Sequence, residues 1–240
     1  MVSIITVNFN QTELTCALLE SIRLQDYLDV EVIVVDNGSR ENPAGIFHTR
    51  YPQVKFLRSE KNLGFAGGNN LALPYATGEY LFFVNNDTEI PDGCIARLIE
   101  FLEKTPGAGI VSPLICYARW TAYGGRHTAD GFEEPDFAEG FYEKTNITIH
   151  TTTAHRPPST VGHPPSTVIQ YAGMPRVNPF TARSRMVGNG LENEGQYTLP
   201  FKTGYAHGAA MMLSREMLQK AGPMQEDYFL YYEEVDWCER

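Results

Sequence analysis

Three apolar runs that each end abruptly in polar residues constrain the fold more than any other feature of this sequence. The runs Val2–Asn8, Val30–Asp36 and Tyr80–Val84 are rich in β-branched or aromatic residues, and stretches with helical periodicity lie between them. Strands that are apolar throughout are typical of sheets covered on both faces. Strands that alternate with helices at this spacing predict a mostly parallel sheet with right-handed crossovers. The expected fold class is therefore α/β, Rossmann-like, with helices on both faces.

Weaker patterns complete the prediction. In the first helix, Leu14, Ala17, Leu18 and Ile22 share one face, and Asn10 with Glu13 matches a capping box. The other expected elements are strands at Val54–Arg58, Ala108–Cys116 and Gly204–Ser214, and helices at Phe65–Ala76, after a cap at Asp92, at Arg215–Ala221 and from Glu233.

The length of 240 residues allows one large domain or two small ones, and either can bury a core large enough to fold without disulfides. We expect a single domain, 1–240. Between residues 117 and 167 the periodicity disappears, and paired glycines and prolines predict long loops. The last expected helix reaches Arg240 without a stop signal, which predicts that the chain is truncated at its C-terminus.

Charge and cysteine usage narrow the function classes. A formal net charge of −10 repels phosphodiester backbones, so nucleic acid is not an expected partner. Four scattered cysteines without a CxxC spacing are typical of a reducing compartment. The sequence shows neither a signal peptide nor an apolar run near the ~20 residues of a membrane span. We expect a cytoplasmic protein, and peripheral contact with a membrane surface is compatible with this expectation.

Polar side chains follow the predicted strands at Asn8, Asp36 and Asn85–Asp87. Because the carboxyl ends of parallel strands share one edge of a sheet, these side chains predict a ligand site there. Asp36 could accept hydrogen bonds from a nucleobase or ribose, and Asp87 could bind a divalent metal whose shell is completed by water and substrate phosphates. The alternative is that these are ordinary turn residues.

The segment Asn62–Asn70 holds three glycines and three asparagines ahead of a helix, which permits close approach of the backbone to a ligand. It matches neither GxGxxG after the first strand nor GxxxxGK[ST], so a dinucleotide-binding fold and a P-loop are disfavoured. A plain glycine-rich turn remains the alternative.

Three carboxylates, Glu233, Glu234 and Asp236, lie within four residues beside large apolar side chains. Apolar surroundings and neighbouring like charges raise carboxylate pKa values, which can produce a general base near neutral pH. Alternatively, they only stabilise the start of a helix. His207, followed by Gly208, lies near the expected site, although a core or surface histidine is the simpler interpretation.

The chain contains, in this order, the motifs SIITVNFN, VIVVDNGS, NLGFAGGNN, YLFFVNNDTEI, HGAAMMLSR and DYFLYYEEVDWCER. Together they resemble the motifs of family 2 glycosyltransferases, particularly of the rhamnosyltransferase-like branch that builds bacterial surface polysaccharides. The resemblance covers most of the chain and is weakest at 117–167, which looks like an insertion. It implies a GT-A fold in which residues 1–116 form the nucleotide-sugar-binding half and 117–240 the acceptor-side half.

The resemblance also implies a reaction and its participants. A sugar, with rhamnose suggested by the branch, would move with inversion from a nucleotide-diphosphate sugar to a hydroxyl of a glycan or lipid-linked saccharide, with Mg²⁺ or Mn²⁺ as cofactor. Asp36 would contact the base, Asn86 the ribose region and Asp87 the metal. The remaining donor-binding positions are Val7, Asn8, Asn62, Gly64, Asn69 and Asn85, and the acceptor positions are His207 and Gly208.

Two positions depart from the family pattern. Asn85 stands where the metal motif usually begins with a carboxylate, and Glu234 stands where an aspartate base is usual, so Glu233 and Asp236 remain competing bases. Two other functions stay open. One is a non-catalytic nucleotide-sugar or glycan-binding domain. The other is a sugar nucleotidyltransferase, which should carry a basic glycine-rich loop after the first strand, where this chain has Asn8-Phe9-Asn10.

Overall fold

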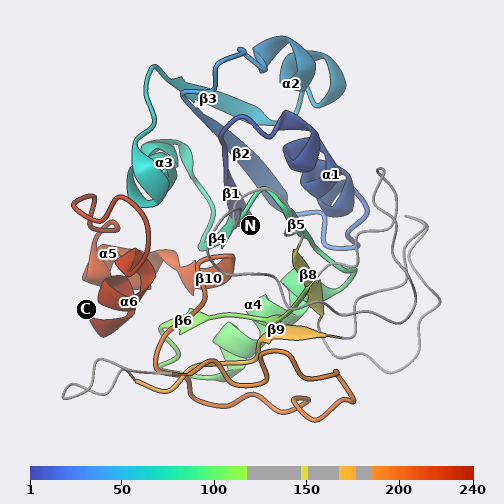
Figure 1. Ribbon diagram of the computed structural model, residues 1–240, viewed down its shortest axis with the longest axis vertical. Coiled ribbons are helices and arrows are strands. Elements are labelled where there is room, and N and C mark those ends of the chain that lie inside the picture. The colour runs from blue at the N-terminus through green and yellow to red at the C-terminus, as the bar shows by residue number, and fades with distance from the viewer. Residues whose placement is uncertain (118–146, 151–167, 177–184) are drawn as a thin grey trace.

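The computed structural model describes residues 1–117, 147–150, 168–176 and 185–240. Its strands form a six-stranded sheet, in the order β3-β2-β1-β4-β10-β6, and a four-stranded sheet, in the order β5-β8-β7-β9 (Figure 1). The strands are β1 Val2–Asn8, β2 Val30–Asn37, β3 Lys55–Ser59, β4 Tyr80–Val84, β5 Thr88–Glu89, β6 Ile110–Val111, β7 Leu114–Tyr117, β8 Ile147–His150, β9 Ile169–Tyr171 and β10 Ala210–Ser214. The helices are α1 Thr12–Arg23, α2 Ala44–Arg50, α3 Gly64–Ala72, the short 3₁₀ helix Leu73–Tyr75, α4 Cys94–Lys104, α5 Arg215–Ala221 and α6 Glu233–Glu239.

The central sheet confirms the predicted mostly parallel α/β class. Strand β1 pairs in parallel with β2 and β4, and β2 pairs in parallel with β3. Strand β10 is antiparallel to both of its neighbours, β4 and β6. Because β10 comes from the second half of the chain, this one sheet contains strands from both predicted halves.

Two apolar clusters cover opposite faces of the central sheet. Helices α1, α2 and α4 contribute to one cluster, and α3, α5 and α6 contribute to the other, as their positions in Figure 1 show. In β1, the neighbours Ile4 and Ile5 point to opposite faces and join different clusters, and neither has exposed surface. The central residues of a strand with helices on both sides are buried whichever face they point to, which favours the apolar runs in the sequence.

The predicted strand Ala108–Cys116 is wrong as a single element. Pro113 has no N–H to donate, and the chain divides there into β6, in the central sheet, and β7, in the second sheet. The predicted strand Gly204–Ser214 is too long, since a turn in which the Ala210 N–H donates to the His207 carbonyl precedes β10.

The expectation of loops throughout 117–167 is wrong at β8. Ile147–His150 pairs with β7 and β5, and its alternation of isoleucine with polar residues is typical of a strand. Residues 118–146 and 151–167 lie outside the described part of the chain.

Both predicted helix caps are wrong. The N-cap of α1 is Gln11, which makes no side-chain cap, and Asn10 instead has a φ of +57° and accepts a hydrogen bond from Arg40 N at 2.9 Å. The N-cap of α4 is Gly93 rather than Asp92. Asn10 therefore joins the loops that follow β1 and β2, which lie at the edge of the sheet where the site was predicted.

The buried face of α1 is rotated from the predicted one. Ala17 is exposed, and the buried positions include Thr15, Leu18, Leu19 and Ile22. A polar residue, Thr15, therefore faces the sheet.

Helix α3 begins at Gly64, where the backbone has a φ of +73°. A Cβ atom at Gly64 would lie 2.4 Å from the carbonyl oxygen of Phe229, and that oxygen accepts a hydrogen bond from Phe65 N at 3.1 Å. Only glycine fits this close approach without strain. The contact joins the start of α3 to the segment that precedes α6.

Gly64→Ala is expected to lower the free energy of unfolding by about 1–3 kcal/mol, because it combines an unfavourable φ with a collision at Phe229. Gly45→Ala in α2 is the control, since a Cβ there meets no atom within 4 Å. The control should keep or slightly raise stability. Urea denaturation measures both, and equal midpoints for Gly64→Ala and the wild type would contradict this account.

Candidate active site

The polar ends of β1 and β2 meet as the sequence predicted. Asn8 and Asp36 are partners in the β1–β2 register, and Asn8 Nδ2 donates to Asp36 Oδ1 at 2.8 Å and to Ser39 Oγ at 3.2 Å. Arg58 Nη1 lies 3.0 Å from Asp36 Oδ2. Asp36 has no exposed surface, and its two oxygens face Asn8 and Arg58 respectively. Sequence reasoning missed Ser39 and Arg58, whose roles depend on a partner in another strand.

Asn85–Asp87 follows β4 at the same edge of the sheet. Asn85 N donates to the Ala209 carbonyl at 2.9 Å, and Asn86 Nδ2 donates to Thr15 Oγ1 at 3.1 Å. Asp87 Oδ1 is buried and has no hydrogen-bond partner, and burial raises the pKa of Asp87 to about 6. An unpartnered buried carboxylate oxygen fits a cation at this position.

Glu233 and Glu234 lie at the start of α6, in apolar surroundings. Burial, together with the charge of Glu233, raises the pKa of Glu234 to about 7. Burial also raises the pKa of Glu233, whose Oε2 has no hydrogen-bond partner. Glu233 is 3% exposed, whereas Glu234 is only partly buried. Glu234 is therefore the more accessible carboxylate that can accept a proton near neutral pH.

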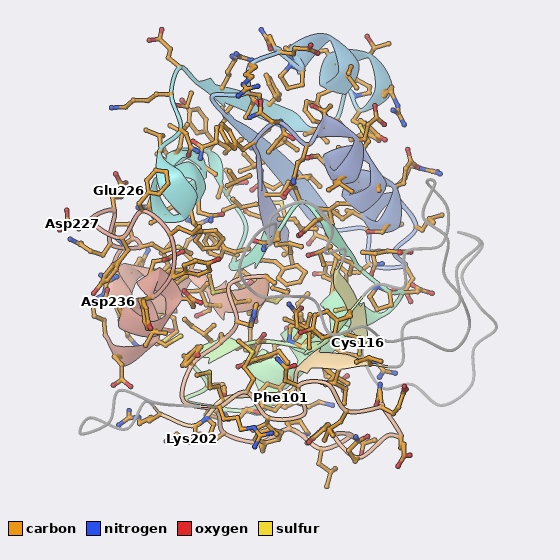
Figure 2. All side chains as sticks on the ribbon, viewed as in Figure 1. Phe101, Cys116, Lys202, Glu226, Asp227 and Asp236 are labelled. Atoms are coloured by element: carbon orange, nitrogen blue, oxygen red, sulfur yellow. The ribbon has the colours of Figure 1, made fainter. Side chains whose placement is uncertain are left out.

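Asp236 differs from its two neighbours. Its Oδ2 lies 3.1 Å from Arg240 Nε. Figure 2 shows Asp236 on the side of the molecule formed by α5 and α6, where it borders a surface cavity together with Asp227. This ion pair and position make Asp236 the least suitable of the three predicted bases.

Of the two predicted acceptor residues, Gly208 lies beside Glu234. A Cβ atom at Gly208 would be 3.8 Å from Glu234 Cδ and 3.4 Å from Phe65 Cζ. His207 Nδ1 accepts a hydrogen bond from Ala209 N at 3.1 Å, and burial lowers the pKa of His207 to about 4. His207 is therefore neutral at physiological pH. The residues before β10 thus contact Glu234 on one side and Asn85 on the other.

Five consecutive large apolar residues, Tyr228–Tyr232, are exposed immediately before Glu233, with exposed fractions between 38% and 66%. Tyr231 and Tyr232 have φ angles of +73° and +72°, a conformation that costs about 1–3 kcal/mol per residue and is frequent at functional sites. Sequence reasoning used these residues only as apolar surroundings for the carboxylates.

The loop before α3 is held by a residue that sequence reasoning missed. Asn37 Nδ2 donates to Asn62 Oδ1 and to the Gly64 carbonyl, both at 3.0 Å, and Asn37 Oδ1 accepts from Leu63 N at 3.0 Å. Asn62 Oδ1 also accepts from Gly64 N at 2.8 Å. Asn62 and Gly64 therefore belong to a loop that is fixed against the end of β2.

Two of the predicted donor-binding residues contribute to packing. Asn69 is 3% exposed, and its Nδ2 donates within α3 to the Phe65 carbonyl at 3.0 Å. Val7 lies against the same helix, since a Cβ at Gly68 would be 3.0 Å from Val7 Cγ1. Both residues hold α3 close to the sheet.

This α/β fold, with polar residues at the carboxyl edge of its parallel strands, is that of the GT-A glycosyltransferases. A mannosyltransferase from Pyrobaculum calidifontis, solved in complex with GDP-Man and Mn²⁺, matches the structure with a TM-score of 0.54 and 18% identity. The match covers 94% of this chain and 48% of the mannosyltransferase. Residues 3–222 match the family model Glycosyl transferase family 2, and the chain belongs to this family. The family predicted from the motifs is thereby confirmed.

Curated relatives have related activities in their names. The chain is 24% identical over 233 residues to the N-acetylglucosaminyl-diphospho-decaprenol L-rhamnosyltransferase of Mycobacterium tuberculosis. This match covers 92% of this chain and 64% of the relative. It is 29% identical over 113 residues to the poly-beta-1,6-N-acetyl-D-glucosamine synthase of Staphylococcus epidermidis. That match covers 46% of this chain and 27% of the relative. The chain spans less than two thirds of the length of either relative.

Glu234→Gln is expected to change how stability depends on pH. Because the folded-state pKa of about 7 exceeds the ordinary value of 4.5, the proton on Glu234 favours the folded state. This contribution is complete below pH 4.5 and is lost as the pH rises through 7. The stability of Glu234→Gln relative to the wild type should therefore increase from pH 5 to pH 8 in urea denaturation. Asp227→Asn, at an exposed position, is the control, and a relative stability of Glu234→Gln that does not change with pH would refute the buried environment.

Proposed function

We propose that this chain transfers a sugar, with inversion, from a nucleotide-diphosphate sugar to a hydroxyl of a saccharide acceptor. The observation that carries the proposal is the connection among three carboxylates, Asp36, Asp87 and Glu234. Buried hydrogen bonds link Asp36 with Asn86, the residue before Asp87. On the other side, Asn85 bonds to the Ala209 carbonyl, and the adjacent Gly208 lies against Glu234.

The acid–base chemistry falls to Glu234. In a single displacement, the acceptor hydroxyl attacks the anomeric carbon from the face opposite the nucleotide, and the bond from that carbon to the diphosphate oxygen breaks. Glu234 accepts the hydroxyl proton, which contributes about 10² to 10⁴ in rate. Burial raises the pKa of Glu234 to about 7, with a smaller contribution from the charge of Glu233, and this value suits the role. A second carboxylate is not needed as a nucleophile, in contrast to retaining glycosidases.

Asp87 is the residue proposed to hold Mg²⁺ or Mn²⁺ through its unpartnered Oδ1. When bound, the ion supplies positive charge that stabilises the departing diphosphate. Within the described ranges, no three His, Cys, Asp or Glu side chains group as metal ligands, so substrate phosphates and water would supply most of the coordination. The Mn²⁺ that accompanies GDP-Man in the mannosyltransferase complex supports this assignment.

For the acceptor, we propose a lipid-linked saccharide, with His207 and Gly208 beside its reactive hydroxyl. The decaprenol-linked saccharide and the rhamnose in the name of the M. tuberculosis relative support this acceptor class and rhamnose as the sugar. The helices of the described part of the chain include none with the length and apolarity to cross a membrane. Because the proposed acceptor is lipid-linked, we propose a cytoplasmic protein in peripheral contact with the inner face of the membrane that holds the acceptor.

Glu234→Gln is expected to reduce transfer about 10²- to 10⁴-fold and to retain nucleotide binding, because it removes the base without changing the volume of the side chain. The assay follows transfer and hydrolysis of labelled UDP-, GDP- and dTDP-sugars with Mn²⁺. Wild-type transfer should rise as the pH increases through about 7, where Glu234 loses its proton.

Asp236→Asn is the matched comparison in this assay, and we expect it to retain transfer because Asp236 pairs with Arg240. The reverse result, with Asp236→Asn inactive and Glu234→Gln active, would move the base to Asp236. Nucleotide binding by the wild type without transfer or hydrolysis would favour a non-catalytic binding domain, a function that Asn85 in the metal motif keeps open.

Asp87→Asn is expected to raise the Mn²⁺ concentration for half-maximal activity at least about tenfold, because it removes the one carboxylate proposed to hold the ion. Chelation with EDTA should abolish wild-type transfer, and added Mn²⁺ should restore it. Titration of activity against Mn²⁺ measures both effects. An unchanged titration curve for Asp87→Asn would contradict this metal assignment.

A further inference from the structure

A buried hydroxyl on α1 connects the two ends of the candidate donor site. Thr15 has no exposed surface. Its Oγ1 donates to Asn8 Oδ1 at 2.9 Å and accepts from Asn86 Nδ2 at 3.1 Å. Asn8 Nδ2 in turn donates to Asp36 Oδ1 at 2.8 Å. A continuous series of buried hydrogen bonds therefore runs from Asp36 to the residue before Asp87.

The groups in this series determine one another's orientation. The Asp36 carboxylate, paired with Arg58, accepts hydrogen bonds, so Asn8 turns its amide nitrogen toward Asp36 and its oxygen toward Thr15. The hydroxyl proton of Thr15 satisfies that oxygen, with the Gln11 carbonyl as a longer alternative at 3.3 Å. An oxygen lone pair of the same hydroxyl then receives the Asn86 amide. One hydroxyl thus orients amides at the ends of β1 and β4.

We propose that Thr15 is a positioning residue that aligns the nucleoside end of the donor site with its diphosphate end. This inference rests on the proposed function. A valine at position 15 would keep the shape of the side chain and leave Asn8 Oδ1 and Asn86 Nδ2 without their buried partner. Because Asn86 directly precedes Asp87, the loss should weaken both nucleotide binding and its dependence on Mn²⁺.

Calorimetric titration with UDP, GDP and dTDP, each with and without Mn²⁺, tests this role. For the nucleotide that the wild type binds, Thr15→Val is expected to raise Kd at least about tenfold and to reduce the gain in affinity that Mn²⁺ provides. Thr15→Ser keeps the hydroxyl and should bind with nearly the wild-type Kd. Should valine prevent folding, Thr15→Cys, a weak hydrogen-bond donor, is expected to raise Kd in the same direction.

Ser3→Ala is the matched control. It removes another buried hydroxyl, at the opposite end of β1, where Ser3 Oγ donates to Glu31 Oε1 at 2.6 Å. This variant should lower the melting temperature and leave the nucleotide Kd unchanged, which separates a loss of stability from a loss of alignment.

Each remaining result decides the proposal. A wild-type Kd and Mn²⁺ response in Thr15→Val or Thr15→Cys would overturn the role of Thr15 and leave the proposed function intact. Equal weakening in Thr15→Val and Thr15→Ser would overturn it too, since packing rather than the hydroxyl would then matter. If the wild type binds none of the three nucleotides, the proposed function is overturned, and the role of Thr15 with it.

Discussion

The hydrogen bond between Asn8 and Asp36 holds the carboxyl ends of β1 and β2 together, and the candidate site is built outward from it. On one side, Arg58 pairs with the Asp36 carboxylate. On the other side, Thr15 carries the connection to Asn86 and so to the end of β4. Loops at the end of a sheet are ordinarily free to move, but these are joined by buried side chains, which cost free energy if a partner is lost. These hydrogen bonds therefore hold the carboxyl ends of β1, β2 and β4 in one arrangement.

Two groups of carboxylates in the described part of the chain have contrasting surroundings. Asp36 and Asp236 pair with arginines, and Glu31 pairs with Lys55. In contrast, Asp87, Glu233 and Glu234 are partly or fully buried, and burial raises the pKa of each of them. Burial of a carboxylate opposes its ionisation, and a bound cation or a transferred proton relieves that cost. Asp87 and Glu234, whose ionisation burial disfavours, thus lie where the proposed reaction needs a metal ligand and a base.

Local patterns predicted most of the fold. The bounds of β1, β4 and α5 follow directly from apolar runs and turn residues, because these signals depend only on neighbours in the sequence. Pro113 is a local sign that Ala108–Cys116 divides into two strands, although the apolar pattern of these residues indicates one. The rotation of the buried face of α1 has a weaker local sign, because the apolar stripe through Leu18 and Ile22 can be extended to either Ala17 or Thr15.

The site residues that were not predicted could not have been found from local patterns. Asn37, Ser39 and Arg58 act on loops or strands other than their own, and a turn residue carries no local sign of which distant atom it will bond. The pairing of β1 with β2 and β4 brings those atoms together. The family resemblance supplied Asp36, Asp87 and Glu234, but the contacts that connect them became visible only in three dimensions.

The most direct measurement is diffraction from crystals grown with a nucleoside diphosphate and Mn²⁺, with anomalous scattering used to locate the manganese. The account predicts an anomalous peak beside Asp87 Oδ1, the diphosphate on the ion, and the nucleoside along the edge between Asp36 and Asn86. Manganese and nucleotide bound elsewhere would contradict it, for example in the surface cavity between α1 and α2 that Asn10, Glu13, Asn42 and Ile46 help to line.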